Sequence, residues 1–234
     1  MLPKCPNLSI RKEKTSMKNK KLRIINYLIV ITVLAAVTVI YPRLPEQIPT
    51  NWGFNGTITY GAKYNIWIIV GMLPLFAVLF DVLPHIDPRR SNYQKFSRFY
   101  DGFCIGFQLF LTVVIGIIIS ESLFPGRLHT GKIIFFLLSL MFLLIGNYLP
   151  KIQSNFYMGI KTPWTLSSDD VWRKTHRLGG KLYAACGILT LLSTLFLPFY
   201  ISGIVLLVLV FGSTLVVTLA SWIWWRKEQH ELEK

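Results

Sequence analysis

Apolar residues along this chain gather into six long runs and do not recur at the periods that mark the core of a soluble domain. A helix that crosses about 30 Å of hydrocarbon needs about 20 mostly apolar residues, and each run is close to that length. The last two runs are nearly continuous, but one helix of their joint length would be about twice the membrane thickness, so we expect a tight hairpin near residues 198–203. The pattern predicts an all-α, polytopic bundle of six transmembrane helices: 24–41, 66–84, 102–123, 132–149, 182–199 and 201–225.

The composition excludes a soluble globular domain. Only 15% of the 234 residues are charged and 53% are hydrophobic, whereas soluble domains carry about 25% charged residues. The mean hydropathy of +0.48 points the same way. The lipid bilayer is therefore the first partner that the sequence predicts.

The positive charges predict the orientation of the bundle. Of the 25 Lys and Arg residues, 21 lie in the two terminal segments or in the second and fourth loops, and four lie in the other loops. Positive residues are retained on the cytoplasmic side of a membrane. We therefore expect both termini and the second and fourth loops to be cytoplasmic. The net charge of +14 then reflects topology, and we expect no direct binding of nucleic acid.

Three regions follow from this layout. Residues 1–23 form a basic cytoplasmic tail, in which Met17 is an alternative start that would leave residues 1–16 untranslated. Residues 24–84 form a two-helix region with an outward loop at 42–65. Residues 85–234 form a four-helix region with a cytoplasmic loop at 150–181.

Motifs that carry catalysis or bind metals are missing from the sequence. There is no H-E-x-x-H, no G-x-S-x-G and no glycine-rich phosphate loop. His85 and Asp87 are two residues apart but have no third ligand nearby, and three cysteines at scattered positions make no metal or disulfide framework. We therefore expect no enzyme activity, no metal and no cofactor.

Ionisable residues at the centre of a span would indicate a pump or carrier. Asp81, Asp101 and Glu121 instead lie near the ends of predicted spans, where we expect them to snorkel or to meet water. Gln108 and Pro74 lie closer to the centre, and they keep a small multipass transporter open as an alternative.

Two loops are distinctive. The outward loop combines three prolines with Trp52 and Phe54, which resists helix and favours a fixed, turn-rich surface. In the cytoplasmic loop, Ser167 and Asp170 have capping-box spacing, and Gly179 with Gly180 is a stop signal. We therefore expect a short interfacial helix at about 168–178, whose apolar residues alternate with cations.

The cytoplasmic loop contains three distinctive segments: G-N-Y-L-P-K-I at 146–152, N-F-Y-M-G-I-K-T-P-W-T-L-S at 155–167 and V-W-R-K-T-H-R-L-G-G at 171–180. Together they resemble the SdpI family of bacterial membrane immunity proteins. The outward loop is similar to the DUF1648 domain that occurs in the same family, through Leu44-Pro45 to Trp52 and Gly61 to Lys63. One departure is Asn51, which stands where that pattern commonly has histidine.

The resemblance implies a protein of the bacterial cytoplasmic membrane that protects the cell against a secreted, membrane-active toxin peptide. It also implies a sensor that sequesters a cognate transcriptional repressor at the membrane when toxin is present. The alternatives are the small transporter and an envelope-stress signalling protein without a cognate toxin.

Two sets of candidate site residues follow from the resemblance. The first, for partner docking or signalling in the cytoplasmic loop, is Asn155, Gly159, Lys161, Thr162, Pro163, Trp164, Thr165, Trp172, Thr175, His176, Arg177 and Gly180. The second, for contact with toxin on the outward side, is Pro45, Pro49, Asn51, Trp52, Phe54 and Gly56.

Overall fold

The computed structural model describes residues 20–53 and 57–233. Six of the helices in this part of the chain are long and apolar enough to cross a membrane, which confirms the predicted number of spans. The elements are α1 (Lys20–Ile40), η1 (Tyr41–Arg43), β1 (Gln47–Trp52), β2 (Ile58–Ala62), η2 (Lys63–Asn65), α2 (Ile66–Ile86), α3 (Arg90–Leu123), α4 (Thr130–Tyr148), η3 (Leu149–Lys151), α5 (Pro163–Ser167), α6 (Asp169–Phe196) and α7 (Phe199–Leu232).

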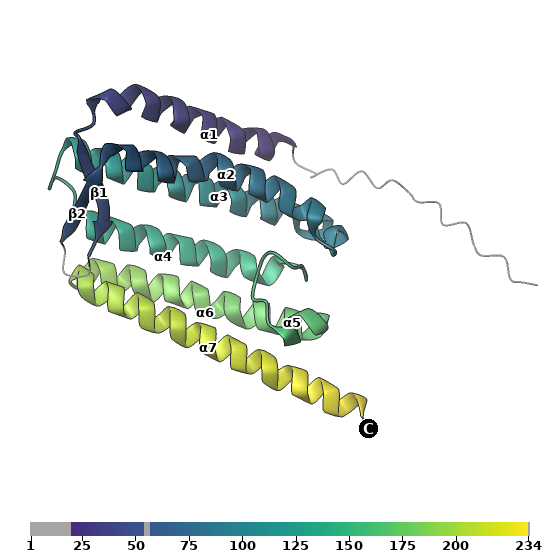
Figure 1. The fold of residues 1–234 in the computed structure, drawn as a ribbon. Coiled ribbons are helices and arrows are strands. Elements are labelled where there is room, and N and C mark those ends of the chain that lie inside the picture. The colour runs from purple at the N-terminus through teal and green to yellow at the C-terminus, as the bar shows by residue number, and fades with distance from the viewer. Residues whose placement is uncertain (1–19, 54–56, 234) are drawn as a thin grey trace, which may run out of the picture.

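The long helices form two groups of three (Figure 1). Helices α1, α2 and α3 pack on one another, and so do α4, α6 and α7, while α3 and α4 join the groups. The chain reverses between α6 and α7 at Leu197 and Pro198, as the length argument predicts. The whole is an all-α bundle with a single two-stranded hairpin in the described residues.

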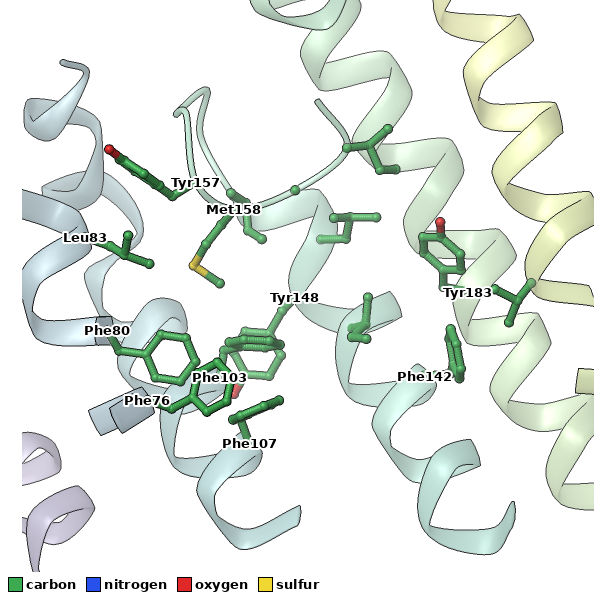
Figure 2. Close-up of a pocket in the computed structure, with 16 residues that line it drawn as sticks. Phe76, Phe80, Leu83, Phe103, Phe107, Phe142, Tyr148, Tyr157, Met158 and Tyr183 are labelled. Atoms are coloured by element: carbon green, nitrogen blue, oxygen red, sulfur yellow. The ribbon is translucent and has the colours of Figure 1, made fainter. Parts of the chain in front are cut away.

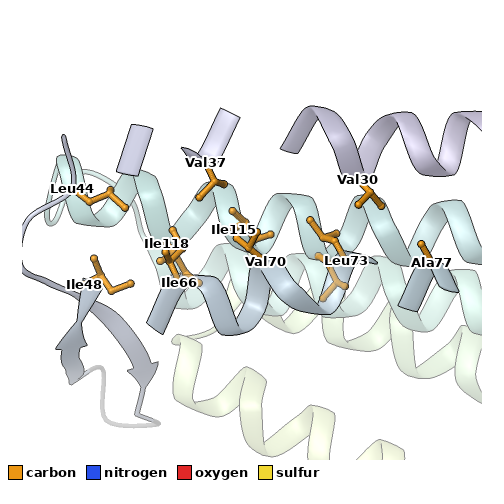
Figure 3. Close-up of a cluster of buried hydrophobic side chains, with 11 residues drawn as sticks. Val30, Val37, Leu44, Ile48, Ile66, Val70, Leu73, Ala77, Ile115 and Ile118 are labelled. Carbon is orange, nitrogen blue, oxygen red and sulfur yellow. The ribbon is translucent and has the colours of Figure 1, made fainter. Parts of the chain in front are cut away.

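The two groups are held together internally in different ways. In the first group, aliphatic side chains such as Val37, Val70 and Ile115 fill a core between α1, α2 and α3 (Figure 3). In the second group, glycines let α4 and α6 approach closely. A Cβ added to Gly146 would lie 2.5 Å from the backbone nitrogen of Ala184, and one added to Gly187 would lie 2.7 Å from the Ser139 carbonyl oxygen. Small residues at a helix interface are a common means of packing in membranes.

The outward loop is more regular than the sequence predicts. Strands β1 and β2 pair antiparallel, with an irregularity in register between Pro49 and Asn51. Ile48 is buried against the first group and belongs to its core. The sequence does not predict this strand, because the prolines interrupt the alternation of apolar and polar residues that marks a strand. Pro49 lies where the register shifts. We call the end of the bundle that carries the strands the hairpin end.

The predicted interfacial helix at 168–178 is wrong as a separate element. These residues are the first turns of α6, which continues without a break to Phe196. Its N-cap is Ser168, whose hydroxyl accepts the Val171 N–H, and not Ser167. Gly179 and Gly180 do not stop the helix. They are buried beneath Leu149, Pro150 and Ile160, so their small size serves close packing.

The helix that contains the third span extends beyond the predicted apolar segment. Helix α3 starts at Arg90 instead of 102, and its backbone departs from helical geometry at Phe96. The added turns are polar and therefore carry no hydropathy signal. They lie at the end of the bundle opposite the hairpin, beside α5, and we call this the loop end (Figure 1).

Candidate functional site

The residues that connect α4 to α6, 149–168, form a folded cap on the loop end. We call this segment the connection. It contains η3, an irregular stretch and the short helix α5. Thr162 caps α5 by accepting the Thr165 N–H, and the Thr165 hydroxyl accepts the Thr162 N–H in return. The sequence analysis missed this capping box because threonine replaces the usual Glu or Gln.

Asn155 organises the irregular part of the connection. Its side chain is fully buried. The amide donates to the carbonyl oxygens of Gln153 (2.9 Å) and Met158 (3.0 Å). Its oxygen accepts the backbone N–H groups of Tyr157 (2.9 Å) and Met158 (2.6 Å). One side chain thus satisfies four backbone groups and fixes the turn at 153–158.

The link between α2 and α3 holds the connection from the other group of helices. Asp87 is buried, and its carboxylate accepts the Phe156 N–H at 2.9 Å and the Tyr93 hydroxyl at 3.0 Å. Arg89 donates to the Ser154 hydroxyl and, at 2.8 Å, to the Leu166 carbonyl oxygen. These bonds cross between the two groups, so movement of one group at this end would pull on the connection.

Helix α6 supplies the third support. The Trp172 indole N–H donates to the Ile152 carbonyl oxygen at 2.9 Å, and its ring stacks on His176 at 4.0 Å. His176 Nε2 accepts the Ile160 N–H at 3.1 Å, so the ring proton is on Nδ1 and is donated to the Trp172 carbonyl oxygen at 2.9 Å. Gly159 has a φ of 106°, and a Cβ at this position would collide with Nε2 of this imidazole. His176 therefore positions the connection.

Burial divides the first set of predicted residues into two classes. Asn155, Thr165, Trp172, Thr175 and His176 are at most 1% exposed, and Gly180 is buried as well, so they hold the cap and cannot themselves form a docking face. Trp172 and His176 thus lie in the interior, whereas Arg177 of the same helix is exposed. The residues at the surface or half-exposed are Gly159, Lys161, Thr162, Pro163, Trp164 and Arg177.

An apolar cavity of about 490 Å³ lies beneath the connection, between the two groups of helices (Figure 2). Its volume is within the range of small-molecule and cofactor sites. Half of its lining residues are aromatic, and Met158 and Tyr157 of the connection form one wall. The contributing aromatic residues are Phe76 and Phe80 from α2, Phe103 and Phe107 from α3, Phe142 and Tyr148 from α4, and Tyr183 from α6.

This cavity is what sequence reasoning missed. It is built from phenylalanines that look like ordinary span residues, and no spacing rule brings α2 and α3 opposite α4 and α6. Asp87 was weighed only as a metal ligand. The Asp87-Pro88 pair signals a turn, but nothing in the sequence identifies its partner 69 residues away. In the described residues, no group of three His, Cys, Asp or Glu side chains is placed to hold a metal.

The second predicted set lies at the hairpin end, far from the connection (Figure 1). Pro45 and Asn51 are exposed, Pro49 is buried and Trp52 is half-buried. Phe54 and Gly56 lie outside the described residues. An ion pair of 2.7 Å between Lys63 and Glu46 closes the base of the hairpin. The two predicted sites are thus at opposite ends of the bundle, as an outward and a cytoplasmic loop would be.

Of the three acidic residues near the span ends, Asp101 and Glu121 are buried and Asp81 is half-buried. Glu121 is 1% exposed and accepts the Gly126 N–H and the Thr130 hydroxyl, both at 2.9 Å. Asp81 pairs with Arg23 at 2.7 Å, and Asp101 is 5% exposed. Gln108 is fully buried and donates to the Leu73 carbonyl oxygen, beside Pro74, so it joins α3 to α2.

Comparison with known proteins confirms the resemblance found in the sequence. Residues 151–221 match the SdpI/YfhL protein family, and residues 28–73 match DUF1648, a domain of unknown function. The immunity protein SdpI of Bacillus subtilis (strain 168) is 26% identical over 212 residues, which are 88% of this chain and 97% of that protein. No solved structure matches the chain at a significant level.

Proposed function

We propose that this multipass membrane protein, similar to SdpI over nearly its whole length, is an immunity protein of the bacterial cytoplasmic membrane. In this proposal it protects the cell that makes it against a secreted, membrane-active toxin peptide. The observation that carries the proposal is the likeness to an immunity protein over 88% of this chain and 97% of the relative. The matched SdpI/YfhL segment, 151–221, includes most of the connection, all of α6 and much of α7.

The aromatic cavity gives this function a physical basis. A membrane-active peptide carries apolar side chains. The cavity can contact them with aromatic rings that belong to the membrane-spanning helices. Because Tyr157 and Met158 form one wall, an occupant would touch the connection directly. Binding in the cavity would then favour one conformation of the connection over another. Such a preference is what couples the cavity to the surface of the loop end.

The exposed residues of the loop end would present that signal. With the orientation expected from the positive charges, Lys161, Trp164 and Arg177 face the cytoplasm. A basic, partly aromatic surface suits a cytoplasmic protein partner. We propose that this partner is a transcriptional repressor, which the surface holds at the membrane. The signal needs no catalytic residue.

The test is a survival assay. Toxin-sensitive cells that express this chain are exposed to increasing amounts of a candidate killing peptide, next to cells with an empty vector. We expect the dose that halves survival to rise at least tenfold, since an inserted protein that binds toxin lowers its free concentration at the membrane. An unchanged dose, with the protein detected in the membrane fraction, would contradict the proposal and favour envelope-stress signalling or transport.

A further inference from the structure

A second, much smaller cavity lies within the first group of helices, near the loop end. Its volume is about 10 Å³, which is room for about one water molecule. Three helices line it with polar side chains: Arg23 and Asn26 from α1, Asp81 from α2, and Tyr100 and Asp101 from α3. Leu22, Phe80 and Cys104 complete the wall.

The charges around this cavity do not balance. Asp81 is neutralised by Arg23, whose guanidinium lies 2.7–2.8 Å from its carboxylate, and it also accepts the Tyr27 hydroxyl. Asp101 is 5% exposed, and among the described residues that line the cavity Arg23 is the one cation. One arginine against two carboxylates leaves one negative charge in a buried place. An uncompensated buried carboxylate is strongly unfavourable.

Two oxygen atoms in the same lining also lack a donor. Asn26 Oδ1 and Asp101 Oδ2 are buried and accept no hydrogen bond from the described part of the chain, and both residues are at least 94% buried. The Tyr100 hydroxyl donates to the Phe80 carbonyl oxygen at 2.5 Å and not to either of these oxygens. The Cys104 thiol is a weak donor. Buried acceptors of this kind require a partner.

We propose that this cavity binds one small monovalent cation, which Asp101 Oδ2 and Asn26 Oδ1 hold between α1 and α3. A single positive charge cancels the surplus negative charge, whereas a divalent ion would leave a surplus of the opposite sign. Hard cations prefer carboxylate and amide oxygens, which are the two unpartnered atoms here. Sodium held by these oxygens and a proton bonded to Asp101 each supply one positive charge, and the experiment distinguishes them. The site does not depend on the proposed immunity function.

The test is the thermal unfolding of the purified full chain in detergent. Sodium chloride is compared with choline chloride at equal ionic strength and fixed pH. A ligand that binds only the folded state stabilises it, so we expect sodium to raise the melting temperature by about 2–4 °C. Asp101→Asn should abolish this shift. Glu121→Gln is the matched control, because that buried carboxylate has its own donors and lines no part of this cavity, and it should keep the shift.

A series of pH values in choline chloride identifies the proton. If sodium has no effect but the melting temperature falls as the pH rises, and Asp101→Asn removes this dependence, the cation is a proton. The charged and titratable groups that face Asp101 here are Arg23, Asp81, Tyr100 and Cys104. If Asp101→Asn does not fold, Asn26→Ala is the second variant, because it keeps both carboxylates. It should weaken the affinity for the cation about tenfold. A wild-type protein that responds to neither sodium nor pH would overturn the proposal.

Discussion

Gly146→Ala is expected to separate α4 from α6 and to destabilise the bundle by about 3 kcal/mol, at the upper end of overpacking effects. The new methyl group would lie 2.5 Å from the Ala184 nitrogen and 2.8 Å from the Gly180 carbonyl oxygen. These are backbone atoms in a second helix, so they move only if the helix moves. For a chain of this size the change corresponds to a melting temperature lower by about 6–12 °C. Thermal unfolding in detergent measures it.

Gly116→Ala is the matched control. A Cβ at this position in α3 has no neighbour within 4 Å, and alanine restricts the unfolded chain more than glycine does. We expect it to leave the melting temperature unchanged or to raise it slightly. Equal melting temperatures for the two variants would mean that α4 and α6 are not in backbone contact at Gly146.

Trp172→Ala is expected to have the largest effect on the connection. The indole is 1% exposed, stacks on His176 and donates to the Ile152 carbonyl oxygen. Truncation of a buried tryptophan costs about 3–5 kcal/mol, and it leaves that carbonyl without its donor. The connection should become less ordered. Limited proteolysis would detect this change as faster cleavage within residues 152–162. Protection in the survival assay should fall with it.

Trp172→Phe separates packing from hydrogen bonding. Phenylalanine keeps a ring over His176 but has no N–H for the Ile152 carbonyl oxygen, so the loss should be about 1–3 kcal/mol. Lys181→Ala, an exposed change farther along α6, should leave cleavage as in the wild type. If Trp172→Ala is cleaved no faster than Lys181→Ala, the indole does not support the connection.

The sequence predicts the spans well because hydropathy depends on composition alone. The six apolar runs and the reversal at Pro198 are read directly from residue type, and the structure agrees. Helix boundaries are predicted less well. The polar turns of α3 before residue 102 and of α6 before Leu182 carry no hydropathy signal, although they are continuous with their spans.

The candidate site was predicted only in part, for a different reason. The motif at 155–167 identified the connection, but its supports are tertiary contacts. Asp87 reaches Phe156 from 69 residues away, and the cavity arises where two groups of helices face each other. Residue type alone also does not predict that Trp172 and His176 are almost fully buried, because tryptophan and histidine are intermediate in how often they are completely buried.

The measurement that tests the account most directly is survival at matched membrane abundance for a variant with a filled cavity. Leu83 lines the cavity, so Leu83→Trp would occupy part of its 490 Å³, whereas Leu215→Trp adds the same bulk on an exposed face of α7. If protection runs through the cavity and the connection, Leu215→Trp protects as the wild type does and Leu83→Trp loses at least tenfold in tolerated toxin. Equal protection by the two variants would contradict the account.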